Sequence, residues 1–137
     1  MKLFLAYRHT GADPAQLEKQ LPAVRDALLG KVDEVYCTFF EENDFQDKSM
    51  SAADIMHHAF DKITELGGLF VLLSSEGKSE GMLMEVGYCI AKNIPVIVAK
   101  HDAVQHTYVP SLANITFDYA DDADLVEQIN KLDLAGL

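Results

Sequence analysis

The feature that most constrains this fold is the alternation of short apolar runs with longer amphipathic segments along the 137 residues. The runs 3–7, 69–73 and 94–99 contain no charged residue. Uninterrupted runs of this length are typical of strands that are covered on both faces of a parallel sheet. Residues 32–39 and 115–119 predict two further strands, because β-branched and aromatic residues are frequent in them.

The segments between these strands carry helix signals. Asp13 can cap a helix, Pro14 suits its first position and Gly30 ends it. Its inward positions are expected to be Leu17, Leu21, Val24 and Leu28. Further helices are predicted over 51–66, 81–92 and 122–132. Five alternations of strand and helix predict an α/β fold: a flavodoxin-like, doubly wound, five-stranded parallel sheet in three α/β/α layers, forming a single domain over 1–137.

Composition excludes several classes of partner. The chain is 49% hydrophobic, which is enough for the core of a globular domain. Its 22 Asp and Glu against 11 Lys and Arg give a net charge of -11. This charge repels a phosphate backbone and argues against nucleic acid as a partner. No apolar run reaches the roughly 18 residues that span a bilayer, so no membrane partner is expected. The N-terminal run ends too early for a signal peptide. Cys37 and Cys89 lie in apolar surroundings and are expected to be buried thiols of a cytoplasmic protein, the alternative being a disulfide between them.

The topology predicts where a ligand binds. In open α/β sheets, ligands bind beyond the carboxyl ends of the strands, here at loops 8–13, 40–50, 74–81 and 100–108. Loop 41–48 is acidic and long enough to act as a lid. Segment 74–81 combines small residues with a helix start, whose free N–H groups suit an anion. Glu85 follows about one turn into that helix, as a nucleophile, a base or an ordinary acid favoured by the helix dipole.

This segment resembles the nucleoside 2-deoxyribosyltransferase superfamily, which includes the 2'-deoxynucleoside 5'-phosphate N-hydrolases. The match runs without a gap through Ser79, Gly81, Glu85, Gly87, Tyr88, Ala91, Lys92, Pro95 and Val96. The resemblance implies that Glu85 is the nucleophile, and counting back places Asp61 at the family's second carboxylate, which orients the sugar or protonates the leaving base. The alternative for Asp61 is a solvated acid paired with Lys62 or Lys92. The resemblance also implies a homo-oligomer.

The substrate-binding residues implied by the resemblance are Ser79 and Gly81. The nucleoside-specific branch has an acid at the Ser79 position, whereas a serine can donate a hydrogen bond to a phosphate. A 5'-phosphorylated substrate is therefore expected, with Lys78 or Arg8 supplying positive charge.

The loop after the first strand departs from the pattern of that superfamily. Its phosphohydrolases have a Gly-Ser-x-Arg-Gly-Gly-like loop there, whereas Tyr7-Arg8-His9 is similar to the first loop of TIR domains. Tyr7, Arg8 and His9 are expected to bind substrate, Tyr7 alternatively only closing the strand. The TIR signature requires Trp-Cys where this chain has Gly81-Met82. A TIR-like NAD glycohydrolase, or a non-catalytic TIR-like nucleotide-binding or interaction domain, is therefore the alternative function.

The leading hypothesis is cleavage or transfer of the N-glycosidic bond of a nucleoside, deoxynucleoside or 5'-monophosphate through a glycosyl ester on Glu85. No cofactor is expected, because no Gly-x-Gly-x-x-Gly follows Tyr7 and no complete phosphate-binding loop is present. No metal is expected either. His57 and His58 each lie three or four residues from Asp54 and from Asp61, which is the spacing of neighbours on one side of a helix, but no third ligand is evident. Two other histidines in a loop at the same edge, His101 and His106, are weaker candidates for contacting a base.

Overall fold

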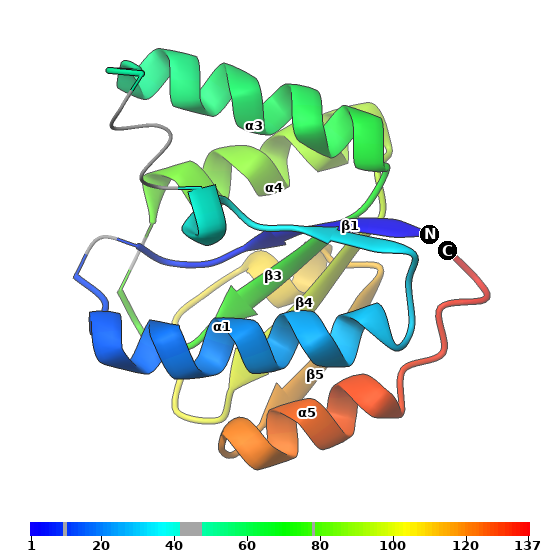
Figure 1. Ribbon diagram of the computed structural model, residues 1–137. Coiled ribbons are helices and arrows are strands. Elements are labelled where there is room, and N and C mark those ends of the chain that lie inside the picture. The colour runs from blue at the N-terminus through cyan, green and yellow to red at the C-terminus, as the bar shows by residue number, and fades with distance from the viewer. Residues whose placement is uncertain (10, 42–47, 78) are drawn as a thin grey trace.

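The computed structural model describes residues 1–9, 11–41, 48–77 and 79–137. Five parallel strands form one sheet in the order β2-β1-β3-β4-β5. Helices cover both faces, with α3 and α4 on one side and α1 and α5 on the other (Figure 1). The predicted five-stranded, doubly wound α/β fold is therefore confirmed. The strands are β1 (Lys2–Ala6), β2 (Glu34–Tyr36), β3 (Leu69–Leu73), β4 (Val96–His101) and β5 (Ile115–Tyr119).

The described residues also form four α-helices and two short 3-10 helices. The α-helices are α1 (Pro14–Leu29), α3 (Ala52–Leu66), α4 (Glu80–Lys92) and α5 (Asp122–Asn130), and the 3-10 helices are η1 (Thr38–Glu41) and η2 (Val109–Leu112). The predicted caps of α1 are present, since Asp13 precedes the helix and Gly30 follows it, and a further glycine ends α3. The Asp13 side chain accepts a hydrogen bond from the N–H of Ala15 at 3.1 Å, and Gly67 ends α3 in the left-handed conformation at φ 82°.

The core lies on both faces of the sheet because successive strand residues point to opposite sides. Leu3 and Leu5 of β1 pack toward α1 and α5, where the predicted inward residues of α1 are all buried. Phe4 and Ala6 face α3 and α4. Cys37 and Cys89 are buried free thiols. None of the described helices is both long and apolar enough to cross a membrane.

Two predicted strands differ from those observed. The strand expected at 32–39 covers only Glu34–Tyr36, because the chain turns into η1, where the N–H of Phe40 donates to the carbonyl of Cys37. The strand expected at 94–99 begins two residues later, since Pro95 has no N–H to donate to the sheet. Residues 42–47 of the predicted lid lie outside the described residues.

Candidate active site

The loops after β1 and β3 meet at the carboxyl edge of the sheet. These two strands are neighbours although the chain passes through β2 between them, so connections leave this point in opposite directions, as at the ligand sites of doubly wound sheets. Arg8 follows β1, and Ser75 follows β3. The Arg8 Nη1 donates a hydrogen bond of 2.9 Å to the Ser75 hydroxyl. The structure therefore places a cation where the sequence predicts a ligand.

Two glycines make room for the Arg8 guanidinium. A Cβ atom added at Gly77 would overlap the guanidinium carbon and both terminal nitrogens, and one added at Gly11 would lie 2.7 Å from Nη2. Gly11 also has a φ of 79°, which side chains with a Cβ rarely adopt. The Nε of Arg8 is buried without a hydrogen-bond partner among the described residues. Arg8 thus retains hydrogen-bonding capacity at the edge of the sheet.

Glu85 lies on the buried side of α4, on the same side as Met82, Val86 and Cys89. Its side chain is 9% exposed, and burial raises its pKa to about 8. The Cys89 thiol lies one turn further along, and its pKa rises to about 12 because of burial and, secondarily, the charge of Glu85. A carboxyl group this poorly solvated gains most from a ligand that develops positive charge beside it.

The start of α4 is formed by the predicted substrate residues. Ser79 is the N-cap, and its hydroxyl accepts a hydrogen bond of 3.3 Å from the N–H of Met82. Gly81 lies against α3, where an added Cβ would contact the Met56 sulfur at 3.5 Å. Glu85 comes six residues after Ser79, which corresponds to about 9 Å along the helix axis. Lys78 lies outside the described residues.

Asp61 is not brought together with Glu85 within one chain. It is exposed on α3, two residues from each of Ala59 and Ile63, which are buried against the sheet. Two residues correspond to about 200° around a helix, so Asp61 lies on the outer side. Neither predicted ion pair of Asp61 is present among the described residues, and Lys62 pairs instead with Glu65 at 3.4 Å. Its catalytic role stays a prediction.

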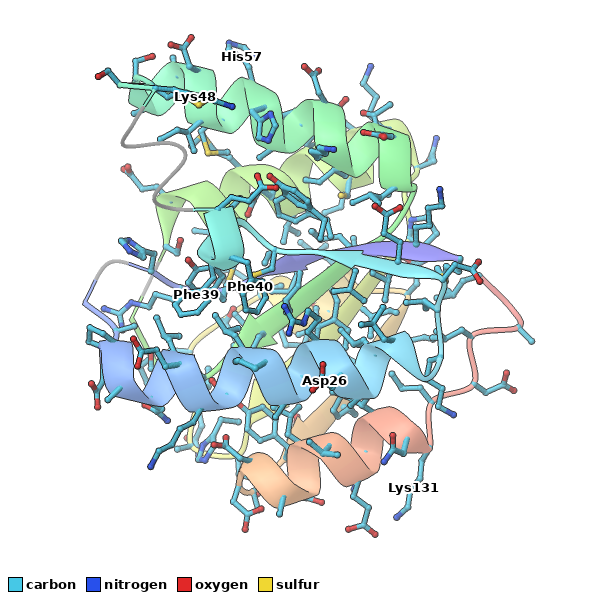
Figure 2. All side chains as sticks on the ribbon, in the orientation of Figure 1. Asp26, Phe39, Phe40, Lys48, His57 and Lys131 are labelled. Atoms are coloured by element: carbon cyan, nitrogen blue, oxygen red, sulfur yellow. The ribbon has the colours of Figure 1, made fainter. Side chains whose placement is uncertain are left out.

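Tyr7 packs on the face of the sheet opposite to α4. It belongs to the core cluster that faces α1, and its ring meets those of Phe39 and His9 edge to face, at 5.8 and 6.3 Å between centroids. Figure 2 shows Phe39 and Phe40 between η1 and α1, where Arg25 of α1 lies 4.2 Å from the Phe40 ring. This placement agrees with Tyr7 closing the strand more than with its stacking on a base beside Glu85.

A polar cluster of Tyr36, Glu41 and His58 was not foreseen from the sequence. The Tyr36 hydroxyl lies 2.7 Å from the Glu41 carboxylate and 2.9 Å from the His58 Nε2. A carboxylate only accepts hydrogen bonds, so Tyr36 donates to Glu41 and accepts from the His58 Nε2–H. Burial, and secondarily Glu41, raises the pKa of Tyr36. The cluster joins η1 to the side of α3 that faces β2, since Lys62 of the same helix also lies over the Tyr36 ring.

The contacts described for the other candidate histidines, His57, His101 and His106, do not include Glu85. His57 points outward from α3 (Figure 2), and no group of three or more metal-binding side chains occurs in the described part of the chain. The backbone N–H groups of Gln105 and His106 donate to the Glu76 carboxylate, at 2.6 and 3.4 Å. The His101 and Tyr119 rings meet edge to face on the other face of the sheet, with their centroids 5.3 Å apart.

Comparison with known proteins finds similarity to solved structures and none to known sequences. No family model and no curated protein matches the chain. The CMP N-glycosidase BcmB of Clostridium botulinum matches with a TM-score of 0.69 and 17% identity, covering 95% of this chain and 98% of that one. A conserved protein of Enterococcus faecalis matches with a TM-score of 0.67 and 19% identity, covering 95% of this chain and 97% of that one. A 2-deoxyribosyltransferase of Bacillus psychrosaccharolyticus matches with a TM-score of 0.62 and 15% identity, covering 99% of this chain and 95% of that one. The resemblance stated from the sequence is thus supported over the whole fold: this chain has the fold that a CMP N-glycosidase and a 2-deoxyribosyltransferase share.

Proposed function

We propose that the protein breaks the N-glycosidic bond of a nucleoside or nucleoside 5'-monophosphate and passes the sugar to water or to a second base. The observation that carries this proposal is Glu85, a buried carboxyl group with a raised pKa on α4. Strongly perturbed carboxyl groups near the carboxyl edge of such a sheet are candidates for catalysis. The shared fold of a CMP N-glycosidase and a 2-deoxyribosyltransferase supports the same reaction class.

In the proposed reaction, the ionised Glu85 carboxylate attacks the anomeric carbon of the sugar. The bond from that carbon to the base nitrogen breaks, the electron pair stays on the base, and the base takes up a proton. The resulting glycosyl ester is cleaved by water or by a second base. Burial disfavours the free carboxylate, whereas positive charge that develops on the sugar stabilises it, so the site favours the transition state over the empty state.

Arg8 and the small residues beside it support a 5'-monophosphate as substrate. Arg8 bonds to Ser75 and keeps a buried Nε without a partner in the described residues, and Ser79 can donate its hydroxyl hydrogen because the bond from Met82 uses only a lone pair. The rise of about 9 Å from Ser79 to Glu85 along α4 leaves room for a pentose between them. We expect the phosphate at the loop and the anomeric carbon near Glu85.

Two groups on α3 are candidates for protonating the leaving base. Asp61 is the residue implied by the family resemblance, but its exposure on the outer side of α3 does not support a direct role within one chain. His58 is half-buried on the side of α3 toward β2 and is held by Tyr36. Separate substitutions of the two residues distinguish these assignments.

A homo-oligomer remains part of the proposal, and an apolar groove beside the site supports it. The groove, of about 320 Å³, runs between α4 and η2, with Ser75 and Ser79 among its lining residues. Tyr108 on its rim is 87% exposed, and Leu112 is also exposed. Exposed apolar patches of this kind are typical of protein interfaces. Tyr108→Asp is therefore expected to lower the molar mass measured by light scattering, and an unchanged mass would exclude this surface.

Release of free base from a panel of substrates tests the proposed function. Wild-type protein is incubated with CMP, dCMP, purine monophosphates, the corresponding nucleosides and NAD, and bases are separated by chromatography. We expect release from monophosphates, loss of that release in Glu85→Gln, and wild-type rates in the matched control Glu80→Gln, an exposed acid on the same helix. Base release that survives Glu85→Gln would refute the nucleophile, and nicotinamide release from NAD alone would assign the TIR-like activity instead.

A further inference from the structure

The loop after β3 is held from both sides at the carboxyl edge of the sheet. β3 lies between β1 and β4 (Figure 1), so its loop separates Arg8, which follows β1, from the loop that follows β4. On the β1 side, Arg8 donates to the Ser75 hydroxyl at 2.9 Å. On the β4 side, the backbone N–H groups of Gln105 and His106 donate to the two carboxylate oxygens of Glu76, at 2.6 and 3.4 Å. Glu76 therefore joins the two loops directly beside the residue to which Arg8 bonds.

The loop after β4 is itself fixed by a charged side chain. The Lys100 ammonium group donates to the carbonyl of Val104 at 2.8 Å and pairs with Asp118 of β5 at 3.4 Å. The carbonyl of Val104 and the N–H of Gln105 belong to one peptide group, which Lys100 and Glu76 therefore hold at its two ends. Hydrogen bonds to charged groups are stronger than those between neutral groups, and neighbouring bonds polarise one another. Glu76 is thus attached to a part of the loop that is tied to β4 and β5.

The position of Arg8 depends on the segment that Glu76 holds. Gly77 lies so close to the guanidinium that a Cβ atom added there would overlap it, and Ser75 is the hydrogen-bond acceptor of Nη1. Glu76 lies between these two residues in the sequence, so a displacement of Glu76 alters both contacts of Arg8. The charge of Glu76 by itself repels a phosphate at this edge. Loss of the charge and loss of the position are therefore expected to act on phosphate binding in opposite directions.

We propose that Glu76 is a positioning residue that fixes the loop after β3, so that Arg8 is held where the 5'-phosphate of the substrate binds. This assignment rests on the proposed function, which places a monophosphate at Arg8. Glu76 does not touch the substrate in this scheme and acts through Ser75 and Gly77. Recognition of the phosphate then depends on a contact with the loop after β4, on the far side of β3 from Arg8.

Base-release kinetics with CMP and cytidine test the proposal. We expect Glu76→Ala to raise KM for CMP about tenfold or more, with little change in kcat, because a phosphate contact is lost equally from the ground state and the transition state. The kcat/KM for cytidine should stay at the wild-type value. Glu76→Gln keeps an acceptor oxygen for the N–H of Gln105 and is expected to restore most of the affinity. The matched control Glu80→Ala removes the same charge from an exposed acid nearby and should leave KM for CMP unchanged or lower it.

A double-mutant cycle shows whether Glu76 acts through Arg8. Glu76→Ala is expected to add little to the effect of Arg8→Ala on KM for CMP. Additive effects, equal losses with CMP and cytidine, or a lower KM for CMP in Glu76→Ala would each overturn the proposal.

The same cycle on the free energy of urea unfolding does not depend on catalysis. Arg8→Ala should cost less stability in the Glu76→Ala background than in the wild type, because the partner of Arg8 is then no longer held. Absence of base release by the wild type would overturn the proposed reaction, whereas additive stabilities would overturn the link between Glu76 and Arg8.

Discussion

The raised pKa of Glu85 predicts a pH-dependent stability that one substitution removes. Burial raises this pKa from 4.5 to about 8 in the folded protein. Above about pH 4.5 the unfolded chain releases the proton, whereas the folded chain keeps it until about pH 8, so the folded state binds more protons in this window. The free energy of unfolding contributed by this group therefore falls as the pH rises. The full loss corresponds to about 5 kcal/mol, and the part between about pH 5.5 and about pH 8.5 is about 3 kcal/mol.

Glu85→Gln isolates this contribution because glutamine keeps the shape of the side chain and does not titrate. We expect the stability of the variant, relative to the wild type, to increase by about 3 kcal/mol between about pH 5.5 and about pH 8.5. The measurement is urea unfolding followed by circular dichroism at both pH values. A constant offset from burying the amide cancels in the comparison, and Glu80→Gln on the exposed side of the same helix controls for general charge effects. Parallel pH dependence of Glu85→Gln and the wild type would refute the argument that Glu85 is buried and protonated.

Four further substitutions test the binding of the substrate and the protonation of the leaving base. Ser79→Asp is expected to reverse or level the preference for monophosphates over nucleosides in the base-release assay, because it places like charges together; an unchanged preference would contradict a phosphate at Ser79. Gly77→Ala is expected to displace Arg8 and to raise KM for monophosphates at least tenfold, with little change for nucleosides; equal effects on both would argue against a phosphate contact. Asp61→Asn should slow base release by less than Glu85→Gln does, with wild-type rates marking it as a bystander, whereas His58→Gln should slow it if His58 protonates the base.

Local signals predicted most of the fold because they act over a few residues. The apolar run 69–73 is a strand with the predicted bounds, and Asp13 and Gly30 cap α1 where expected. The length of β2 was not predictable in the same way. Its end depends on a turn at Cys37 and on pairing with β1 along only three residues, both of which are properties of the folded chain.

The positions of the candidate site residues in the fold were predictable only in part. Glu85 lies about one turn into α4, which follows from the predicted helix start, whereas its burial comes from the packing of the folded chain and its catalytic role stays a prediction. The face occupied by Tyr7 was not evident, because an uninterrupted apolar run does not tell which residues point to which side. The outward position of Asp61 was evident from the helical spacing, because Asp61 lies two residues from each of the inward-facing Ala59 and Ile63. The hydrogen bond between Tyr36 and His58 joins distant parts of the sequence and had no local signal.

The packing of Arg8 against Gly77 and Gly11 makes the identities of these three residues interdependent. A side chain at either glycine is incompatible with the arginine in its present position, whereas a chain that lacked the arginine would tolerate alanine at Gly77 far better. The effects of Gly77→Ala and Arg8→Ala on stability should therefore be strongly non-additive in a double-mutant cycle. A side chain at Gly77 must move the guanidinium, the far end of a flexible side chain, away from Ser75. Relatives that keep the arginine in this position are therefore expected to keep both glycines.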